Sequence, residues 1–232
     1  MNMNELLSES LYFGFSLSLV TYWLGTQVQK KLKHPICNPL LISVTLCIII
    51  LALTDISYET FNYGAKYINY LLTPTTVCLA VPLYKQLQVL KDNLAAVLLS
   101  ITAGAVSCIF VVIGLAAITK LDSALTFTLM PKSITTAIAI GLSEEIGGIP
   151  AVTVSAVVIT GLIGSILAQT LFKLLKIDHP VAQGLALGTA SHAMGTSKAL
   201  EIGEIQGAMS SLSIVVAGII TVIAIPLLVP LV

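Results

Sequence analysis

Five long apolar runs constrain the fold of this chain more than any other feature. They are residues 10–29, 36–54, 93–119, 146–172 and 205–232, and none contains a charged residue. A helix needs about 20 apolar residues to cross a hydrocarbon layer of about 30 Å. Only 9% of the 232 residues are charged, against about a quarter in a soluble domain. The runs predict an all-α polytopic membrane protein, organised as a single integral-membrane domain over residues 1–232.

The composition excludes several classes of function. All eleven basic residues are lysines, so a bidentate arginine clamp on a phosphate or carboxylate is excluded. A net charge of zero with no long basic run argues against nucleic-acid binding. The cysteines stand singly in apolar segments, without the spacing of a metal site, and no cofactor is implied. They are Cys37, Cys47, Cys78 and Cys108.

Three stretches predict helices that are broken or too short to cross a membrane. Residues 71–84, "LLTPTTVCLAVPLY", contain Pro74 and Pro82, each of which removes a backbone donor. The uncharged run from Ser133 to Ser143 is short enough for a half-helix or a re-entrant segment. Residues 181–200 form a semi-polar stretch. With the long runs, these give about seven or eight membrane helices or half-helices.

The lysines predict an orientation. Lys30, Lys31 and Lys33 follow the first run, so the positive-inside rule places the N-terminus outside. Lys85 and Lys91 then also lie inside. Residues 173 and 176, both lysine, lie inside only if residues 133–148 do not fully cross. The N-terminal "MNMNELLSES" lacks the positive region of a signal peptide, so the first span is expected to be retained.

Two short internal similarities raise the possibility of an inverted repeat. "KLKHP" (31–35) is similar to "KIDHP" (176–180), and "PTTVCLA" aligns with "ITTAIAI" sixty residues later. The two halves would be residues 10–120 and 121–232. Repeats built on broken helices are a recurring pattern among secondary transporters.

The stretch "GTASHAMGTSKALE" (188–201) carries polar groups where a membrane segment is expected. Thr189, His192 and Thr196 would line one helix face, and Lys198 is spaced to pair with Glu201. Ionisable groups inside membranes are costly and usually functional, so His192, Thr196, Ser197 and Lys198 are candidate substrate-binding residues. The alternative is that the histidine and threonine bond across helices while the lysine extends to the interface.

Other candidates flank the predicted breaks. Glu144 and Glu145, in "SEEIGGIP", are candidates for proton coupling, or they belong to a solvated turn. The remaining candidate substrate-binding residues are Asn38, Thr75, Thr76, Thr135 and Thr136. A half-helix N-terminus offers free amides to an anion, although hydroxyl groups near a break also satisfy freed carbonyls.

Enzymatic activity is not expected. Ser197 and Lys198 raise the possibility of a hydrolytic pair, but adjacent residues on a helix do not face each other, and no catalytic motif accompanies them. His34 and His179, each before a proline, are interpreted as loop or cap residues.

These motifs carry a resemblance to the LrgB/CidB family of bacterial membrane proteins. The matching stretches are "NPLLIS", "LLTPTTVCLAVPLYKQ", "SEEIGGIPAVT", "HPVAQGLALGTASHAMGTSKALE" and "GAMSSL". They are distributed over essentially the whole chain.

The resemblance implies two functions. One is a transporter or facilitator of small monocarboxylates, because bacterial relatives are linked to pyruvate and a chloroplast relative carries glycolate and glycerate. The other is a holin-like or antiholin-like regulator of murein hydrolase activity and autolysis. Both imply a bacterial cell membrane, a homo- or hetero-oligomer and a small LrgA/CidA-type partner subunit. Broken helices and a few polar groups favour the transporter, since a pore would show a polar stripe along complete helices. A carbonyl selectivity filter of the ion-channel type is not evident.

Overall fold

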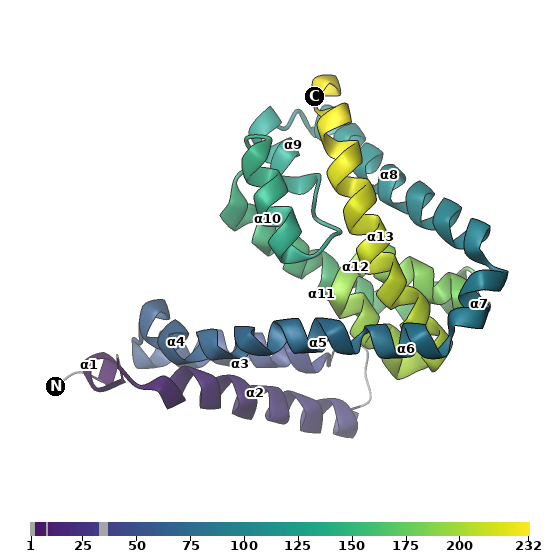
Figure 1. The fold of residues 1–232 in the computed structure, drawn as a ribbon. Helices are drawn as coiled ribbons and strands as arrows, with labels where there is room; N and C mark the ends of the chain where they lie inside the picture. The colour runs from purple at the N-terminus through teal and green to yellow at the C-terminus, as the bar shows by residue number, and fades with distance from the viewer. Residues whose placement is uncertain (1–2, 8, 33–36) are drawn as a thin grey trace. The chain divides into compact units, whose positions relative to one another are not determined.

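The computed structural model describes residues 3–7, 9–32 and 37–232, and every regular element in these ranges is a helix (Figure 1). The prediction of an all-α fold is therefore confirmed. The chain divides into two compact units, and the division falls between Cys78 and Leu79. Whether they act as one membrane domain, as the sequence predicts, stays a prediction.

The helices of the first unit are α1 (Met3–Leu7), α2 (Leu11–Leu32), α3 (Pro39–Thr54), α4 (Tyr58–Ala65), the 3-10 helix η1 (Lys66–Leu71) and α5 (Leu72–Cys78). Those of the second unit are α6 (Ala80–Lys85), α7 (Leu87–Asp92), α8 (Leu94–Thr119), α9 (Ser123–Leu129), α10 (Thr136–Glu145), α11 (Pro150–Leu174), α12 (Pro180–Ile202), α13 (Glu204–Leu228) and the 3-10 helix η2 (Val229–Leu231).

The first unit is built on the packing of α2 against α3 and α4. Gly25 allows close approach, because a Cβ there would lie 2.5 Å from the carbonyl oxygen of Pro39. Thr21 and Ser43 bond through their hydroxyls at 2.9 Å, in the buried contact between α2 and α3. Small residues and hydroxyl bonds are typical of helix contacts inside membranes, where lipid removes the hydrophobic drive to associate.

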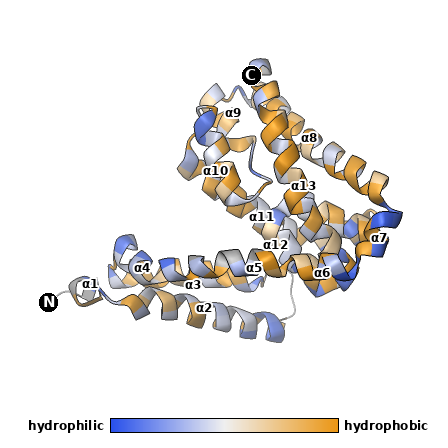
Figure 2. Ribbon diagram, viewed as in Figure 1, coloured by the Kyte–Doolittle hydropathy of each residue, from blue (hydrophilic) through white to orange (hydrophobic). Residues whose placement is uncertain are grey.

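Among the described residues, α8, α11 and α13 are long and apolar enough to cross a membrane. Figure 2 shows α8 and α13 hydrophobic over most of their length and α7 hydrophilic. These three helices correspond to predicted runs 93–119, 146–172 and 205–232. The run predicted over 36–54 gives a shorter helix, α3, with 16 residues. The total of seven or eight membrane elements stays a prediction.

The stretch with two prolines is broken, as predicted. The chain forms η1, α5, α6 and α7 in succession between Lys66 and Asp92. Pro74 and Pro82 are each the third residue of a short helix. The first four amides of a helix have no partner within it, so proline is tolerated there and instead prevents a longer helix from continuing through that point.

Helix α12 is in fact two short helices joined at Ser191 and His192. The backbone of Ser191 has φ −129° and ψ 16°, and that of His192 has φ 42° and ψ −133°. Neither pair is helical. We call residues 180–202 the α12 hairpin, with a first arm before Ser191 and a second arm after His192.

Two contacts establish that the second arm runs back along the first. Gln206, just after the hairpin, bonds Gln183 near its start, Nε2 to Oε1 at 3.1 Å. A Cβ on Gly195 would lie 3.0 Å from the carbonyl carbon of Leu187, eight residues earlier. A straight helix would separate residues eight apart by about 12 Å. The chain therefore enters and leaves the hairpin at the same end.

A second excursion, which we call the α10 hairpin, covers residues 129–148. The chain returns at Ile149 to the position of Thr128, as shown by the hydrogen bond that the amide of Ile149 donates to the Thr128 hydroxyl at 2.8 Å. Thr153 donates to Ser143 at 2.7 Å and lies 3.0 Å from the Thr128 carbonyl oxygen. Ten-residue α10 is thus a returning half-helix, as the run from Ser133 to Ser143 predicts.

The two hairpins start from opposite ends of α11. The α10 hairpin precedes its first residue, Pro150, and the α12 hairpin follows its last turn. The tip of the α12 hairpin reaches the middle of α11, where Gly161 makes room for the His192 ring. Ser133 and Thr189, one from each hairpin, line one small pocket against α8 and α13. The two hairpins therefore meet inside the second unit. The predicted repeat of 10–120 and 121–232 stays a prediction.

Candidate functional site

A cavity of about 640 Å³ lies between α8 and the first arm of the α12 hairpin. Asn93 and His179, at the starts of α8 and α12, lie at one end of it. Cys108, Ser133 and Thr189 lie at the other end, near the middle of α8, where the hairpins meet. Ser100, Gly104 and Ser107 form a small, polar face of α8 along its length. The cavity is thus a vestibule leading from one end of the unit to its middle.

Lys132 places a positive charge at the deep end of this vestibule. Its Nζ lies 3.3 Å from the Cys108 sulfur and 3.2 Å from the Ser133 hydroxyl, and the side chain is half-buried. The described residues lining the cavity include no aspartate or glutamate. No described carboxylate lies within ion-pair distance of Lys132. An ammonium held among neutral groups in this way can accept an anion as its counter-charge.

Thr189 supplies a second polar group at the same place. Its hydroxyl is buried and has no hydrogen-bond partner among the described residues, and the residue is 8% exposed. Gly104 on α8 allows its approach, since a Cβ there would lie 2.9 Å from the Thr189 methyl carbon. A buried hydroxyl without a partner is rare and calls for an explanation, such as a ligand or a water molecule.

The prediction that Thr189, His192 and Thr196 share one helix face is wrong, because the helix reverses between them. Thr189 lines the cavity. His192 turns instead toward α11, where its Nε2 lies 3.0 Å from the Val157 carbonyl oxygen. Its side chain is 4% exposed. His192 therefore fixes the tip of the α12 hairpin to α11.

The backbone at His192 provides a test of this reversal. A φ of 42° with ψ −133° is a conformation that glycine adopts without strain, whereas other residues incur about 1–3 kcal/mol. His192→Gly and His192→Ala both lose the imidazole contact. We expect the glycine variant to be the more stable by about 1–2 kcal/mol, as measured by thermal unfolding in detergent micelles. An alanine variant of equal or greater stability would contradict the strained turn.

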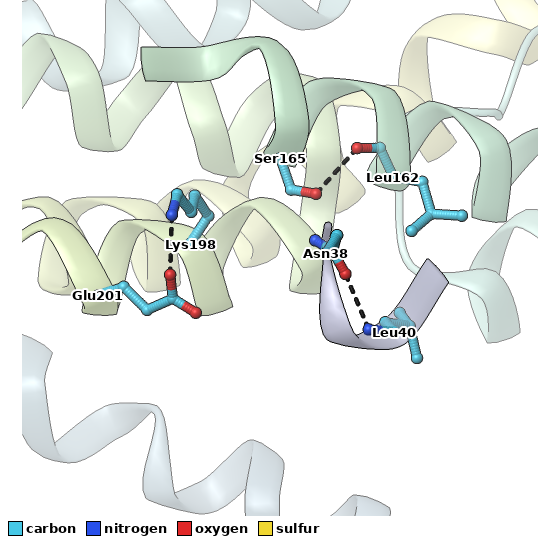
Figure 3. A network of polar contacts seen from close by, with 6 residues as sticks. All are labelled: Asn38, Leu40, Leu162, Ser165, Lys198 and Glu201. Atoms are coloured by element: carbon cyan, nitrogen blue, oxygen red, sulfur yellow. Dashed lines mark hydrogen bonds and ion pairs between the residues drawn. The ribbon is translucent and has the colours of Figure 1, made fainter. Parts of the chain in front are cut away.

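The other candidates in this stretch lie on the second arm. The Thr196 hydroxyl donates to the His192 carbonyl oxygen at 3.0 Å and lies 2.7 Å from the Ser210 hydroxyl on α13. Ser197 is exposed. Lys198 pairs with Glu201 at 2.8 Å, as their spacing predicts (Figure 3). Thr196 thus links the start of the second arm to α13. Neither it nor Lys198 is among the residues lining the cavity.

The candidates on the α10 hairpin lie at both ends of its half-helix. Thr135 is the N-cap residue and Thr136 the first residue of α10, close in sequence to Lys132 and Ser133. Glu144 and Glu145 are exposed at the opposite end. The start of α10 therefore follows closely, along the chain, on two residues that line the cavity. The two glutamates do not line it. A role for them in proton coupling stays a prediction.

The remaining candidates belong to the first unit. Asn38 caps α3, its Oδ1 accepting the amide of Leu40 at 2.9 Å (Figure 3). Thr75 is exposed on α5, and Thr76 lies on the same helix. The helix-start interpretation of Asn38 is confirmed. Lys33 and His34 lie outside the described residues.

The cation at this site is the residue that sequence reasoning did not identify. Lys132 stands in a connector, "LMPKSITT", that precedes a predicted half-helix. The sequence does carry a signal for it, because a lysine beside the start of a re-entrant segment is a charge at membrane depth, and such charges are usually functional.

Comparison with known proteins gives a consistent family. The LrgB-like family matches residues 18–231. Antiholin-like protein LrgB from Bacillus cereus (strain B4264) is 39% identical over 220 residues, which cover 94% of this chain and 96% of that protein. The protein of the same description from Bacillus anthracis (strain A0248) gives the same values. No solved structure matches the chain.

Proposed function

This chain belongs to the LrgB-like family of membrane proteins, and from that premise we propose that it transports small monocarboxylates, such as pyruvate, lactate or glycolate. The observation that carries the proposal is a vestibule that ends at Lys132, where two hairpins from opposite ends of the second unit meet. Discontinuous helices that meet at mid-depth around a binding site are a recurring arrangement in secondary transporters.

The charge of the cavity supports an anionic substrate. Lys132 brings one positive charge, and no acidic side chain among the described lining residues offsets it. Burying an unpaired charge is costly, so a bound anion with one negative charge would complete the site. A volume of about 640 Å³ lies within the usual range of small-molecule sites, roughly 300–1,000 Å³.

Apolar packing beyond the deep end of the vestibule favours a transporter over an open pore. Met130 and Ile134 of the α10 hairpin pack with Ile109, Leu142 and Ile225 in one buried cluster. The small polar face of α8 covers only the half of the helix that lines the cavity. A continuous polar path through the unit would need this cluster to separate, which is the type of movement that alternating access requires.

The lysines give the vestibule a proposed direction. Asn93 and His179 line one end of it, so the starts of α8 and α12 lie at the same end of the unit. Lys91 precedes α8, and Lys173 and Lys176 precede α12. By the positive-inside rule, we assign this end to the cytoplasmic side of the bacterial cell membrane. The N-terminus outside remains part of the same proposal.

The test is uptake of labelled pyruvate, lactate and glycolate into vesicles containing this protein, with and without an LrgA/CidA-type partner subunit. We expect saturable uptake of one of these acids and weak competition by malonate, since its second negative charge has no counter-charge at the site. Equal leakage of glycerol, sucrose and the acids would contradict a transporter. Flux only with the partner would make this chain one subunit of a two-component transporter.

A second candidate function is supported by the name of the relatives. Both Bacillus proteins are described as antiholin-like, which suggests a regulator of murein hydrolase activity and autolysis. The two proposals differ in measurable ways. A holin-like assembly would leak many solutes without saturation, and its effect would depend on oligomerisation. A transporter would change autolysis only through the flux of its substrate, so autolysis would respond to the external concentration of that acid.

A further inference from the structure

We propose that the substrate carboxylate is bound jointly by Lys132 on the α10 hairpin and Thr189 on the α12 hairpin, and that it thereby links the two hairpins. This inference rests on the proposed function and assigns residues to it. The two side chains line the same cavity, and each lacks one kind of interaction partner among the described residues. Lys132 has no counter-charge among the described residues, and the Thr189 hydroxyl has no hydrogen-bond partner among them.

The contacts of Lys132 leave its charge available. Cys108 and Ser133 are neutral neighbours, at 3.3 Å and 3.2 Å from the Nζ, and they orient the ammonium without neutralising it. Ser133 also contacts Cys108, at 3.1 Å between oxygen and sulfur. These three residues form one polar cluster between α8 and the tip of the α10 hairpin. An ammonium has three donors, so one remains available for a carboxylate oxygen.

The position of Thr189 makes it the second contact. A threonine inside a helix usually donates its hydroxyl to the carbonyl one turn earlier, as Thr102 does to Leu98 on α8 at 2.7 Å. The Thr189 hydroxyl makes no such bond. It shares a small pocket with Cys108 and Ser133, so it lies beside the polar cluster of Lys132. A hydroxyl donor placed there suits the second oxygen of a carboxylate.

This arrangement determines selectivity and coupling together. One carboxylate neutralises one ammonium, whereas a dicarboxylate would leave a second negative charge buried without a partner. The two contacts come from hairpins that start at opposite ends of α11. Binding therefore lowers the free energy of the state in which both tips are together, and release of the substrate allows them to separate.

The test measures binding separately from transport. In a variant with Cys37, Cys47 and Cys78 replaced by serine, Cys108 remains as a probe beside Lys132. Pyruvate is expected to slow its alkylation by N-ethylmaleimide in a saturable manner, and malonate much less. Lys132→Gln is expected to weaken protection at least about tenfold, the effect of losing a charged hydrogen bond. Lys132 contacts the Cys108 sulfur itself, so replacing this lysine changes the surroundings of the probe. A second probe is therefore Ser107→Cys in a background in which Cys108 is also replaced, since residue 107 lines the same cavity.

The threonine has its own matched set of variants. Thr189→Val is expected to weaken pyruvate protection about tenfold, whereas Thr189→Ser retains it. The melting temperature of the ligand-free Thr189→Val protein should not fall, because the lost hydroxyl has no partner in the protein. Thr102→Val and the exposed Lys120→Gln serve as controls and should bind as the unchanged protein does.

The outcomes separate this inference from the proposed function. Protection lost in Lys132→Gln and Thr189→Val, but with no saturable uptake in vesicles, would support the site and contradict the transporter. Saturable uptake with unchanged affinity in both variants would support the transporter and overturn the site. A lower melting temperature for ligand-free Thr189→Val would assign the hydroxyl a structural role and also overturn the proposal.

Discussion

Gly195→Ala destabilises the protein by about 3 kcal/mol or more, an effect at the upper end of those expected when a methyl group is forced into a packed site. Gly195 lies on the second arm of the α12 hairpin, where a Cβ would collide with the carbonyl oxygen of Leu187 and lie 2.7 Å from the Cβ of Ser191. The obstacle is mainly backbone of the first arm, which cannot move aside as a flexible side chain can. The two arms would have to separate, and this would also disrupt the packing of the hairpin on α13.

Two other glycines provide controls with the opposite expected sign. Gly114 on α8 and Gly141 on α10 have no atom within 4 Å of an added Cβ. Alanine at either position should stabilise the protein by about 0.5–1 kcal/mol, since glycine is unfavourable inside a helix. Thermal unfolding of the three alanine variants in detergent tests this comparison. If Gly195→Ala matched the controls, the reversal of α12 would be wrong.

The long helices could be predicted from the sequence because their signal is local. A run such as 93–119 contains no charge over the length of a membrane crossing, and α8 follows it closely. The breaks at Pro74 and Pro82 were predictable for the same reason, since proline limits a helix wherever it occurs. The half-helix α10 required only the length of an uncharged run.

The reversal at His192 could not be predicted in this way. No glycine or proline stands at the break itself, and the residue with positive φ is a histidine. The turn depends on residues of another helix. Gly161 and Gly164 of α11 leave space for the His192 ring and the Ser191 side chain, and Val157 provides the acceptor for the imidazole. Such contacts arise only from tertiary structure, so a helical face drawn through residues 189–196 misplaced Thr189 relative to His192.

The residues of the candidate site likewise differ in whether a local sequence signal or a tertiary contact reveals them. Composition identifies the stretches around Ser133 and Thr189 as unusual, whereas nothing in it singles out Lys132. Its significance comes from Cys108, 24 residues earlier, which lies 3.3 Å from its Nζ. Lys198 attracted attention as a charge in a semi-polar stretch, but its partner Glu201 is only three residues away. A charge neutralised locally requires no ligand, whereas an unpaired charge in a cavity does.

A disulfide between positions 104 and 189 is expected to abolish the proposed transport, and reduction of the disulfide is expected to restore uptake in part. A Cβ placed on Gly104 lies 3.7 Å from the Cβ of Thr189, close to the mean of about 3.8 Å found in disulfides. In a background without the four native cysteines, Gly104→Cys with Thr189→Cys should therefore oxidise readily. The bond would fix the tip of the α12 hairpin to α8 at the deep end of the vestibule.

The reason for a complete loss is that, in the proposed transporter, substrate passes between these two elements. The vestibule is bounded by α8 on one side and the first arm of the α12 hairpin on the other, so alternating access requires their separation to change. Thr189→Cys also removes the proposed carboxylate contact, and uptake by the reduced double variant should already be weakened. The informative comparison is therefore the same vesicle preparation before and after reduction with dithiothreitol. Gly114→Cys with Thr189→Cys is the control, since position 114 has no close neighbour and should form no disulfide. Undiminished uptake by the fully oxidised 104–189 variant would mean that the hairpin tip and α8 move as one body, and the gating movement would then have to lie in the α10 hairpin.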